Sequence, residues 1–422
     1  MRGKKLTLVL VDQPLIAVAI SFCFLAVLLY KRVNLGIVLP ATALVLGLLA
    51  LDWLTIPQVI YETTSDLLTV SVVLSTFGIM LLSQLYKETR LINRLSDSLS
   101  HLINNPKIVL SLLPAVIGFL PVAGGALMSA PLVDSEADKL NLKPARKAYV
   151  NFWFRHTIFP VYPLSQVLIL AAALSEVTVI SIVIRQIPVV ITMVVVGYLI
   201  GFSKTPKVKR DEAHTNANES RSNLRGFLVS FSPILITIIV AVVLGAVDPE
   251  LSKLGYDALV AILVGLALIL AITRPSWHVF TGPFKTWGIY GITAAAYGAF
   301  LLRGVLIAAG IPDLFTSFAA NGTIDTTLLL VIVPAALGML TASALGGVSI
   351  SIPILGGIIA LSPRTASLIY MSAYLGYVMS PTHLCLTFTA DHFKCTLDKI
   401  YKYAIPSFLA TFATTLLIYF LV

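Results

Sequence analysis

The sequence predicts an all-α membrane protein with about ten transmembrane helices plus two re-entrant hairpins, arranged as two inverted-topology repeats. Three observations lead to this fold class. The chain is 58% hydrophobic and only 12% charged, about half the charged fraction of a soluble globular protein. Apolar runs of about twenty residues recur, and such a run crosses a bilayer as a helix because its backbone groups then pair within the segment. A glycine- and proline-rich pattern also occurs once in each half of the chain.

Ten apolar segments have the length expected of full spans. They are residues 14–30, 35–51, 66–86, 149–171, 177–201, 227–247, 257–273, 287–309, 366–388 and 404–421. The first of them lacks a small-residue cleavage site, so we interpret it as a span and expect no cleavable signal peptide.

Two further segments, 108–132 and 327–361, are apolar but broken in the middle by Gly, Pro and small polar residues. Each limb has only about 12–14 residues, too few to cross a bilayer. Broken backbone at membrane depth is tolerated where it lines a cavity inside the protein. Both segments are therefore predicted to be re-entrant hairpins.

The two hairpins share a motif. The pattern P-A-x-x-G-x-L begins at Pro114 and again at Pro334, and each copy continues into a Gly-Gly pair. The helix after each hairpin is interrupted by a proline, Pro160 in one half and Pro381 in the other. The repeated order favours two related halves over a chance recurrence of Gly and Pro.

The distribution of basic residues gives an orientation. With the N-terminus outside, 21 of the 29 Lys and Arg fall on the inner side, five on the outer side and three within spans, as the positive-inside rule requires. The first repeat is then 1–202 and the second 227–422, each with five spans and one hairpin, and they are inverted relative to each other. The polar stretch 203–226 is a cytoplasmic linker, and both termini are outside.

The positions of the acidic residues in the sequence argue against a relay of buried carboxylates. All 20 Asp and Glu fall in loops or at span ends, whereas proton-driven carriers often hold an acid within a span. A coupling cation would instead use backbone carbonyls and hydroxyls, as hard cations accept. The candidate cation-binding residues are Pro121, Ser343, Ser349, Ser380 and Thr382.

The hairpin tips favour an anionic substrate, because half-helices that begin there point unpaired N–H groups and a positive dipole end into the protein. The alternative is that the small residues only permit close helix packing, which explains Gly118 and Gly338 well. The candidate substrate-binding residues are Val122, Ala123, Gly124, Gly125, Ser129, Asn151, Arg155, His156, Thr341, Ser343, Gly346, Gly347, Thr382 and His383.

Four charged or titratable residues in the spans have two interpretations each. Arg155 either faces an anionic substrate or snorkels to the cytoplasmic side, and snorkelling is favoured because only about six residues separate it from the predicted span end. His156 is a proton carrier or, more commonly for such a residue, an interhelical hydrogen bonder. His383 either faces the site or packs in the protein interior without a functional role, and the two interpretations are equally favoured. Arg303 either attracts anions or snorkels outward.

The runs LLPAVIGFLPVAGGALMSAPLVD, NFWFRH and GYVMSPTHLCLTFT resemble the domain-of-unknown-function 401 (DUF401) family of prokaryotic integral membrane proteins. The resemblance covers nearly the whole chain. It implies a place in the ion transporter superfamily, whose members include sodium-coupled dicarboxylate, citrate, gluconate and arsenite carriers. Inverted repeats, two re-entrant hairpins, a dimeric scaffold, elevator-type alternating access and a prokaryotic plasma membrane are implied with it. The chain departs from the dicarboxylate carriers in having no Ser-Asn-Thr motif at either hairpin, so their specificity and sodium ligands are not carried over.

Together these observations predict a secondary active transporter of a small, carboxylate-like organic anion, coupled to sodium or protons. A channel or passive facilitator is the alternative. An enzyme is not expected, because no HExxH or acidic metal motif is present, and the absence of GxxxxGK[ST] excludes a P-loop pump. No cofactor is expected beyond a sodium ion, and no Cys/His cluster has zinc spacing. The expected partners are the lipid bilayer, the anion, the coupling ion and a second copy of the chain, with no nucleic acid, since the net charge of +9 arises from loops that orient the chain.

Overall fold

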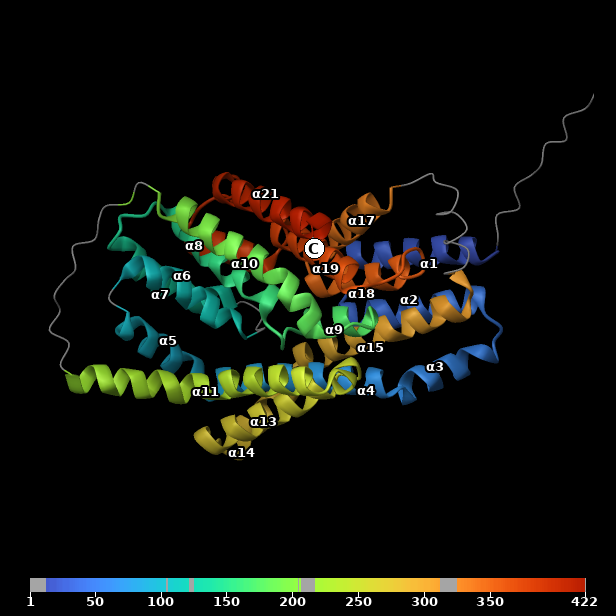
Figure 1. Cartoon of the computed structure of the whole chain (residues 1–422), viewed down its shortest axis with the longest axis horizontal. Helices are drawn as coiled ribbons and strands as arrows, with labels where there is room; N and C mark the ends of the chain where they lie inside the picture. Colours follow the sequence, from blue (N-terminus) through green and yellow to red (C-terminus); the bar gives the residue numbers. More distant parts are fainter. Residues whose placement is uncertain are drawn as a thin grey trace, which may run out of the picture.

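The structure is a computed structural model of the chain (Figure 1). The residues that it describes are 13–103, 105–120, 125–203, 205, 217–311 and 325–421. Every regular element in these ranges is a helix, which confirms the predicted all-α class.

Eleven elements of the described residues precede residue 202. They are α1 (Gln13–Tyr30), α2 (Leu35–Ala50), α3 (Thr55–Ser65), α4 (Leu67–Glu88), α5 (Leu91–Leu102), α6 (Pro106–Gly118), α7 (Gly125–Asp138), α8 (Pro144–Thr157), the 3-10 helix η1 (Phe159–Val161), α9 (Gln166–Leu174) and α10 (Val179–Gly201).

The described elements after residue 216 complete the fold. They are α11 (Ala217–Val247), α12 (Pro249–Lys253), α13 (Tyr256–Thr273), α14 (Trp277–Thr281), the 3-10 helix η2 (Gly282–Lys285), α15 (Trp287–Ala308), α17 (Thr326–Thr341), α18 (Ala344–Leu355), α19 (Pro363–Met379), α20 (Leu384–His392) and α21 (Leu397–Leu421).

Within the described residues, seven segments are long and apolar enough to cross a membrane. They are Leu67–Glu88, Pro144–Leu174, Val179–Gly201, Ser222–Val247, Tyr256–Thr273, Trp287–Ala308 and Leu397–Leu421. Each coincides with a predicted span, so the multi-pass membrane character is confirmed. The other three predicted spans correspond to the shorter helices α1, α2 and α19.

Two pairs of short helices occupy the segments predicted as hairpins. α6 packs against α7, and α17 packs against α18; the first pair lies toward the left of Figure 1 and the second right of centre. The break in the second pair is only two residues long. Ala342 takes a left-handed conformation with φ of 48°, and Ser343 then caps α18 by accepting a hydrogen bond from the Gly346 N–H.

Two helices are interrupted where proline predicted an interruption. α8 ends at Thr157 and α9 begins at Gln166, while α19 ends at Met379 and α20 begins at Leu384. The predicted spans 149–171 and 366–388 are therefore each two helices rather than one. Both also begin earlier than predicted, because Pro144 and Pro363 occupy the first helical turn, where a proline is well tolerated.

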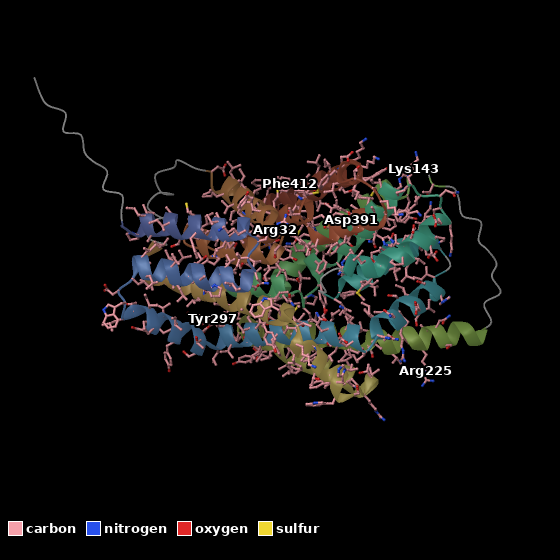
Figure 2. All side chains as sticks on the ribbon, turned by 180° about the vertical axis from the view of Figure 1, so that it is seen from behind. Arg32, Lys143, Arg225, Tyr297, Asp391 and Phe412 are labelled. Carbon is pink, nitrogen blue, oxygen red and sulfur yellow. The ribbon has the colours of Figure 1, made fainter. Side chains whose placement is uncertain are left out.

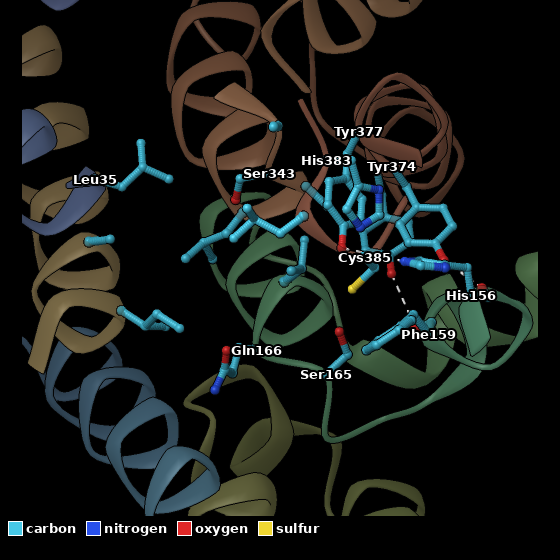
Figure 3. A pocket seen from close by; sticks show the side chains of 18 of the residues that line it. Leu35, His156, Phe159, Ser165, Gln166, Ser343, Tyr374, Tyr377, His383 and Cys385 are labelled. Carbon is cyan, nitrogen blue, oxygen red and sulfur yellow. Dashed lines mark hydrogen bonds between the residues drawn. The ribbon is translucent and has the colours of Figure 1, made fainter. Parts of the chain in front are cut away.

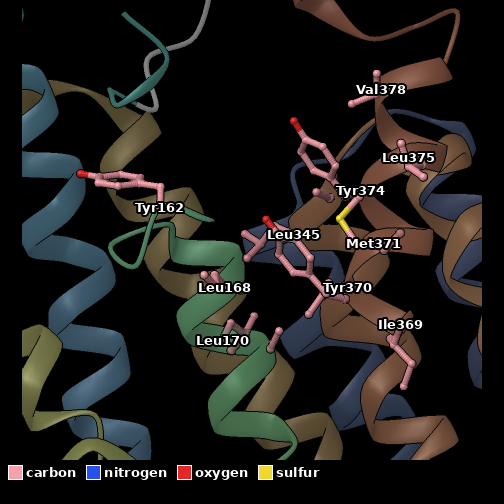
Figure 4. Close-up of a cluster of buried hydrophobic side chains, with 14 of the residues drawn as sticks. Tyr162, Leu168, Leu170, Leu345, Ile369, Tyr370, Met371, Tyr374, Leu375 and Val378 are labelled. Carbon is pink, nitrogen blue, oxygen red and sulfur yellow. The ribbon is translucent and has the colours of Figure 1, made fainter. Parts of the chain in front are cut away.

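Glycines bring the short helices close to the interrupted ones. A Cβ at Gly338 of α17 would overlap the carbonyl group of Ala373 in α19, and a Cβ at Gly118 of α6 would lie 2.6 Å from the carbonyl oxygen of Arg155 in α8. The packing interpretation of these two glycines therefore holds. The same region contains much of the core, where Tyr370, Met371 and Leu375 of α19 lie near residues of α9 and α18 (Figure 4).

Basic residues do not all gather at one end. Figure 2 places Lys143 and Arg225 toward one end of the long axis and Arg32 near its middle. The prediction had put all three on the same side. α1 and α2 are joined by a short turn and pack against each other. The turn that carries Arg32 therefore lies near the middle of the long axis and not at the end that carries Lys143 and Arg225.

Candidate functional site

A cavity of about 350 Å³ lies where the two interrupted helices approach each other (Figure 3). Its polar side is formed by Arg155 and His156 at the end of α8 and by His383 and Cys385 at the start of α20. The opposite wall comes from α2 and α15 and includes Leu35 and residues of the Gly291–Ala295 turn. No acidic residue is among the described residues that line it. The volume is at the lower end of the range for small-molecule sites.

Three helices begin at the wall of this cavity. α9 follows Ser165, α18 follows Ser343 and α20 follows His383, and first-turn residues of all three line the space. The first N–H groups of a helix have no intrahelical partner, and the helix dipole places partial positive charge there. Ser165 and His383 provide no side-chain cap. The N-termini of α9 and α20 are therefore uncapped, whereas Ser343 caps α18 through the Gly346 N–H, and the dipoles of all three helices give the cavity wall a positive potential that suits an anion.

Arg155 adds a full positive charge to this wall. Its side chain is buried, with 2% of the residue exposed, and Nη2 donates a hydrogen bond to the carbonyl oxygen of Leu120 at 3.3 Å. Nε and Nη1 have no hydrogen-bond partner among the described residues, and none of the ion pairs found there includes Arg155. A Cβ at Gly125 would overlap the guanidinium, so the charge also lies against the N-terminus of α7, which does not neutralise it.

The burial of the Arg155 side chain, with 2% of the residue exposed, favours the interior position over snorkelling. The snorkelling interpretation assumed that the span begins near residue 149, about six residues away. α8 begins at Pro144, eleven residues before Arg155, which is about 16 Å along a helix. The guanidinium does not extend along α8 toward Pro144 but lies against Leu120 and Gly125.

A buried histidine pair lies beside the guanidinium. The rings of His156 and His383 are perpendicular, with centroids 4.8 Å apart, and both residues are 2% exposed or less. His156 Nδ1 is 2.7 Å from the carbonyl oxygen of Phe152, whereas neither ring nitrogen of His383 makes a hydrogen bond of normal geometry in the described part of the chain. One ligand atom each of His156, His383 and Cys385 lies within 4.8 Å of the other two. Among the predicted site residues, these two histidines are thus brought together.

The family match comes from a comparison with protein-family models. A model described as "Protein of unknown function (DUF401)" matches residues 15–422. The chain belongs to the DUF401 family. No curated protein matches it. The family description assigns no activity, so the function of this DUF401 protein has to be argued from its cavity.

Three more of the predicted substrate residues, Ser129, Asn151 and Thr341, have structural partners. Ser129 donates to Asn151 Oδ1 at 2.6 Å, and Asn151 Nδ2 donates to the carbonyl oxygen of Ala126 at 3.0 Å. This buried network ties α7 to α8 and does not line the cavity. Thr341 donates to the carbonyl oxygen of Leu337. Pro121, Val122, Ala123 and Gly124 lie outside the described residues.

The predicted cation ligands are only partly assembled. Ser380 donates to the carbonyl oxygen of Met339 at 2.7 Å, and its hydroxyl is 3.1 Å from that of Thr382. Ser343 lines the cavity, whereas Ser349 is buried further along α18, where it is 3.3 Å from the carbonyl oxygen of Gly346.

The two other predicted glycines belong to helix packing. A Cβ at Gly346 would lie 2.7 Å from Thr341 Oγ1, and one at Gly347 would lie 2.8 Å from the Ala373 Cβ. Arg303 forms an ion pair with Glu176, and its side chain is 29% exposed, so it neither lines the cavity nor lacks a partner.

Sequence reasoning missed the aromatic side of the site. Tyr370, Tyr374 and Tyr377 of α19 line the cavity. Tyr370 donates to the carbonyl oxygen of Phe159 at 3.2 Å, and Tyr374 donates to that of His156. These bonds hold the interrupted end of α8 against α19. Tyrosines spaced at three and four residues on one helix face were the available signal.

Proposed function

We propose that this DUF401 protein is a secondary active transporter of a small organic anion of the carboxylate class, coupled to sodium or protons. The observation that carries the proposal is the cavity lined by Arg155 and by first-turn residues of α9, α18 and α20. As finer parts of the same proposal, the chain belongs to the ion transporter superfamily, forms a homodimer and works by elevator-type alternating access in a prokaryotic plasma membrane. Its termini face outward.

The balance of charges at the cavity favours an anionic substrate. A buried arginine without a carboxylate partner is costly in a membrane protein and is expected to face a substrate or a water-filled space. Three helix N-termini add positive potential rather than compensating it. An anionic ligand relieves both costs at once, because its oxygens accept hydrogen bonds from the guanidinium and from the first-turn N–H groups.

The carrier mechanism is supported by the arrangement of the short and interrupted helices. α6 begins at residue 106 and α17 at residue 326, and the interrupting prolines are residues 160 and 381. Corresponding elements thus recur about 220 residues apart. Paired, interrupted helices that meet at a binding site are typical of carriers built from inverted repeats.

The coupling ion has neutral ligands available. Since the described lining has no acidic residue, a sodium ion would use hydroxyl and carbonyl oxygens such as those of Ser343, Ser380 and Thr382. A proton would use the histidine pair. The transport assay below separates the two.

The test is uptake by proteoliposomes that contain the purified full-length chain. A panel of labelled small carboxylates is offered under an inward sodium gradient, an inward proton gradient or no gradient. We expect one class of carboxylate to accumulate above equilibrium under one of the gradients, and we expect Arg155→Met to abolish the accumulation. Equilibration without any gradient dependence supports the facilitator alternative instead. No flux of any anion under any gradient contradicts the proposal.

A further inference from the structure

We propose that His156, His383 and Cys385 form a binding site for one borderline or soft transition-metal ion, for which Zn²⁺ is the ion to test. The site opens onto the cavity. Metal binding is measurable without transport, so a negative result for this proposal leaves the proposed function untouched, and the reverse also holds.

The three residues offer a suitable donor set in a suitable place. Two imidazoles and one thiolate are ligands that Zn²⁺ and related ions prefer. Their ligand atoms lie within 4.8 Å of one another, and all three residues line the same cavity, which gives an ion a route of entry. A tetrahedral zinc site needs ligand atoms about 3.3–3.6 Å apart, so the widest pair has to close by about 1 Å. His383 lies in the interruption between α19 and α20, where the backbone is not held by helical hydrogen bonds on both sides.

His156 is already oriented as a ligand. The carbonyl oxygen of Phe152 can only accept, so the Nδ1 atom that lies 2.7 Å from it carries the hydrogen. In the neutral imidazole the lone pair is then on Nε2. Its nearest polar contact is the Tyr377 hydroxyl at 3.5 Å, which is too long to occupy it. A histidine that donates one nitrogen to a backbone carbonyl and presents the other is the common arrangement at metal sites.

His383 supplies the second, independent observation. Its imidazole is buried, and neither nitrogen makes a hydrogen bond of normal geometry among the described residues, although the backbone of Tyr377 and Val378 lies close to the ring. Aromatic rings of Phe152 and Tyr377 fix the ring, with centroids at 5.5 Å and 4.0 Å. A buried polar group is normally satisfied. An ion bound between His156 and His383 would give His383 a partner that no described residue supplies with normal hydrogen-bond geometry.

The charge of Arg155 bears on the ligand that fills the fourth coordination position of the bound ion. Two neutral imidazoles and one thiolate leave a divalent ion with one net positive charge, beside a guanidinium that has no carboxylate partner. A fourth protein ligand is missing from the described lining, so one position faces the cavity. We infer that an anion or hydroxide fills this position, where it also neutralises Arg155.

The first measurement is Zn²⁺ binding to the detergent-purified, chelator-stripped full-length protein, followed by competition with a chromophoric chelator. We expect one tight site per chain, with the affinity lowered at least tenfold by Cys385→Ser and by His383→Gln. The matched controls are Cys395→Ser and His392→Gln, which change the same residue types elsewhere in the same region and should leave the affinity unchanged. Co²⁺ should give a thiolate charge-transfer band that Cys385→Ser removes and Cys395→Ser keeps.

A second measurement needs no variant, and so covers the case in which a variant does not fold. Alkylation of the wild-type thiols is followed by mass spectrometry with and without Zn²⁺. We expect Zn²⁺ to protect Cys385 and to leave the alkylation of Cys23 and Cys395 unchanged. Equal alkylation of Cys385 in both conditions, or Zn²⁺ affinity that is the same in Cys385→Ser and wild type, overturns the proposal.

Discussion

Replacement of Arg155 by methionine should make the ligand-free protein more stable, the opposite of what loss of a buried structural arginine does. Nε and Nη1 are buried without a partner among the described residues, and an unsatisfied buried donor costs about 1–3 kcal/mol. Methionine is unbranched and has no donors, so it replaces the aliphatic part of the arginine side chain without the guanidinium. The change removes one hydrogen bond, to Leu120, and a bond from a charged donor contributes about 1.5–3 kcal/mol. Two such donors cost about 2–6 kcal/mol, so after the loss of the Leu120 bond the middle of the range is a gain of about 2 kcal/mol in unfolding free energy.

The assay is thermal unfolding of the detergent-purified protein in a buffer without carboxylates or oxyanions. We expect the apparent Tm of Arg155→Met to lie above that of the wild type. Arg303→Met is the matched control, because it removes an arginine that is already paired with Glu176; loss of a partly exposed ion pair should lower stability by about 1 kcal/mol or less. A lower Tm for Arg155→Met than for the wild type would refute the reasoning, since it would mean that Arg155 holds the fold together.

Two glycine substitutions should separate ligand binding from folding. Gly125→Ala places a Cβ on the Arg155 guanidinium, so we expect it to abolish the anion-dependent rise in Tm while the protein still folds; Gly288→Ala, which meets nothing within 4 Å, should keep the full rise. Gly338→Ala forces α17 away from the carbonyl of Ala373 and should lower stability by about 1–3 kcal/mol, seen as a lower Tm and a lower yield of monodisperse protein. A normal anion response in Gly125→Ala, or an unchanged Tm in Gly338→Ala, would count against the close contacts described above.

Hydropathy and proline placement predicted the helical elements because both are local properties. The seven candidate spans coincide with predicted ones, and the interruptions at Pro160 and Pro381 lie where the rings remove a backbone donor. The positions of the helix ends are harder to predict from the sequence. The polar first turn from Pro144 gives no apolar signal, so the predicted span began at residue 149, after the start of the helix.

The site itself was only partly predictable, since its contacts join distant parts of the chain. Arg155, His156, Ser343 and His383 were singled out and all line the cavity. Cys385 was not, because zinc motifs are recognised by short spacings and its partner His156 is 229 residues away in the sequence. A single sequence carries no signal for such a pairing until the two interrupted helices are placed side by side.

The most direct test of an anion carrier is the thermal stability of the wild-type protein against a panel of small carboxylates and oxyanions, each as its sodium and its potassium salt. A ligand that binds only the native state raises the unfolding midpoint by mass action. We expect members of one class of carboxylate to raise the Tm, with a larger rise in sodium if sodium is the coupling ion and equal rises if it is the proton. No rise with any anion in either salt would contradict the assignment of the cavity to an anion.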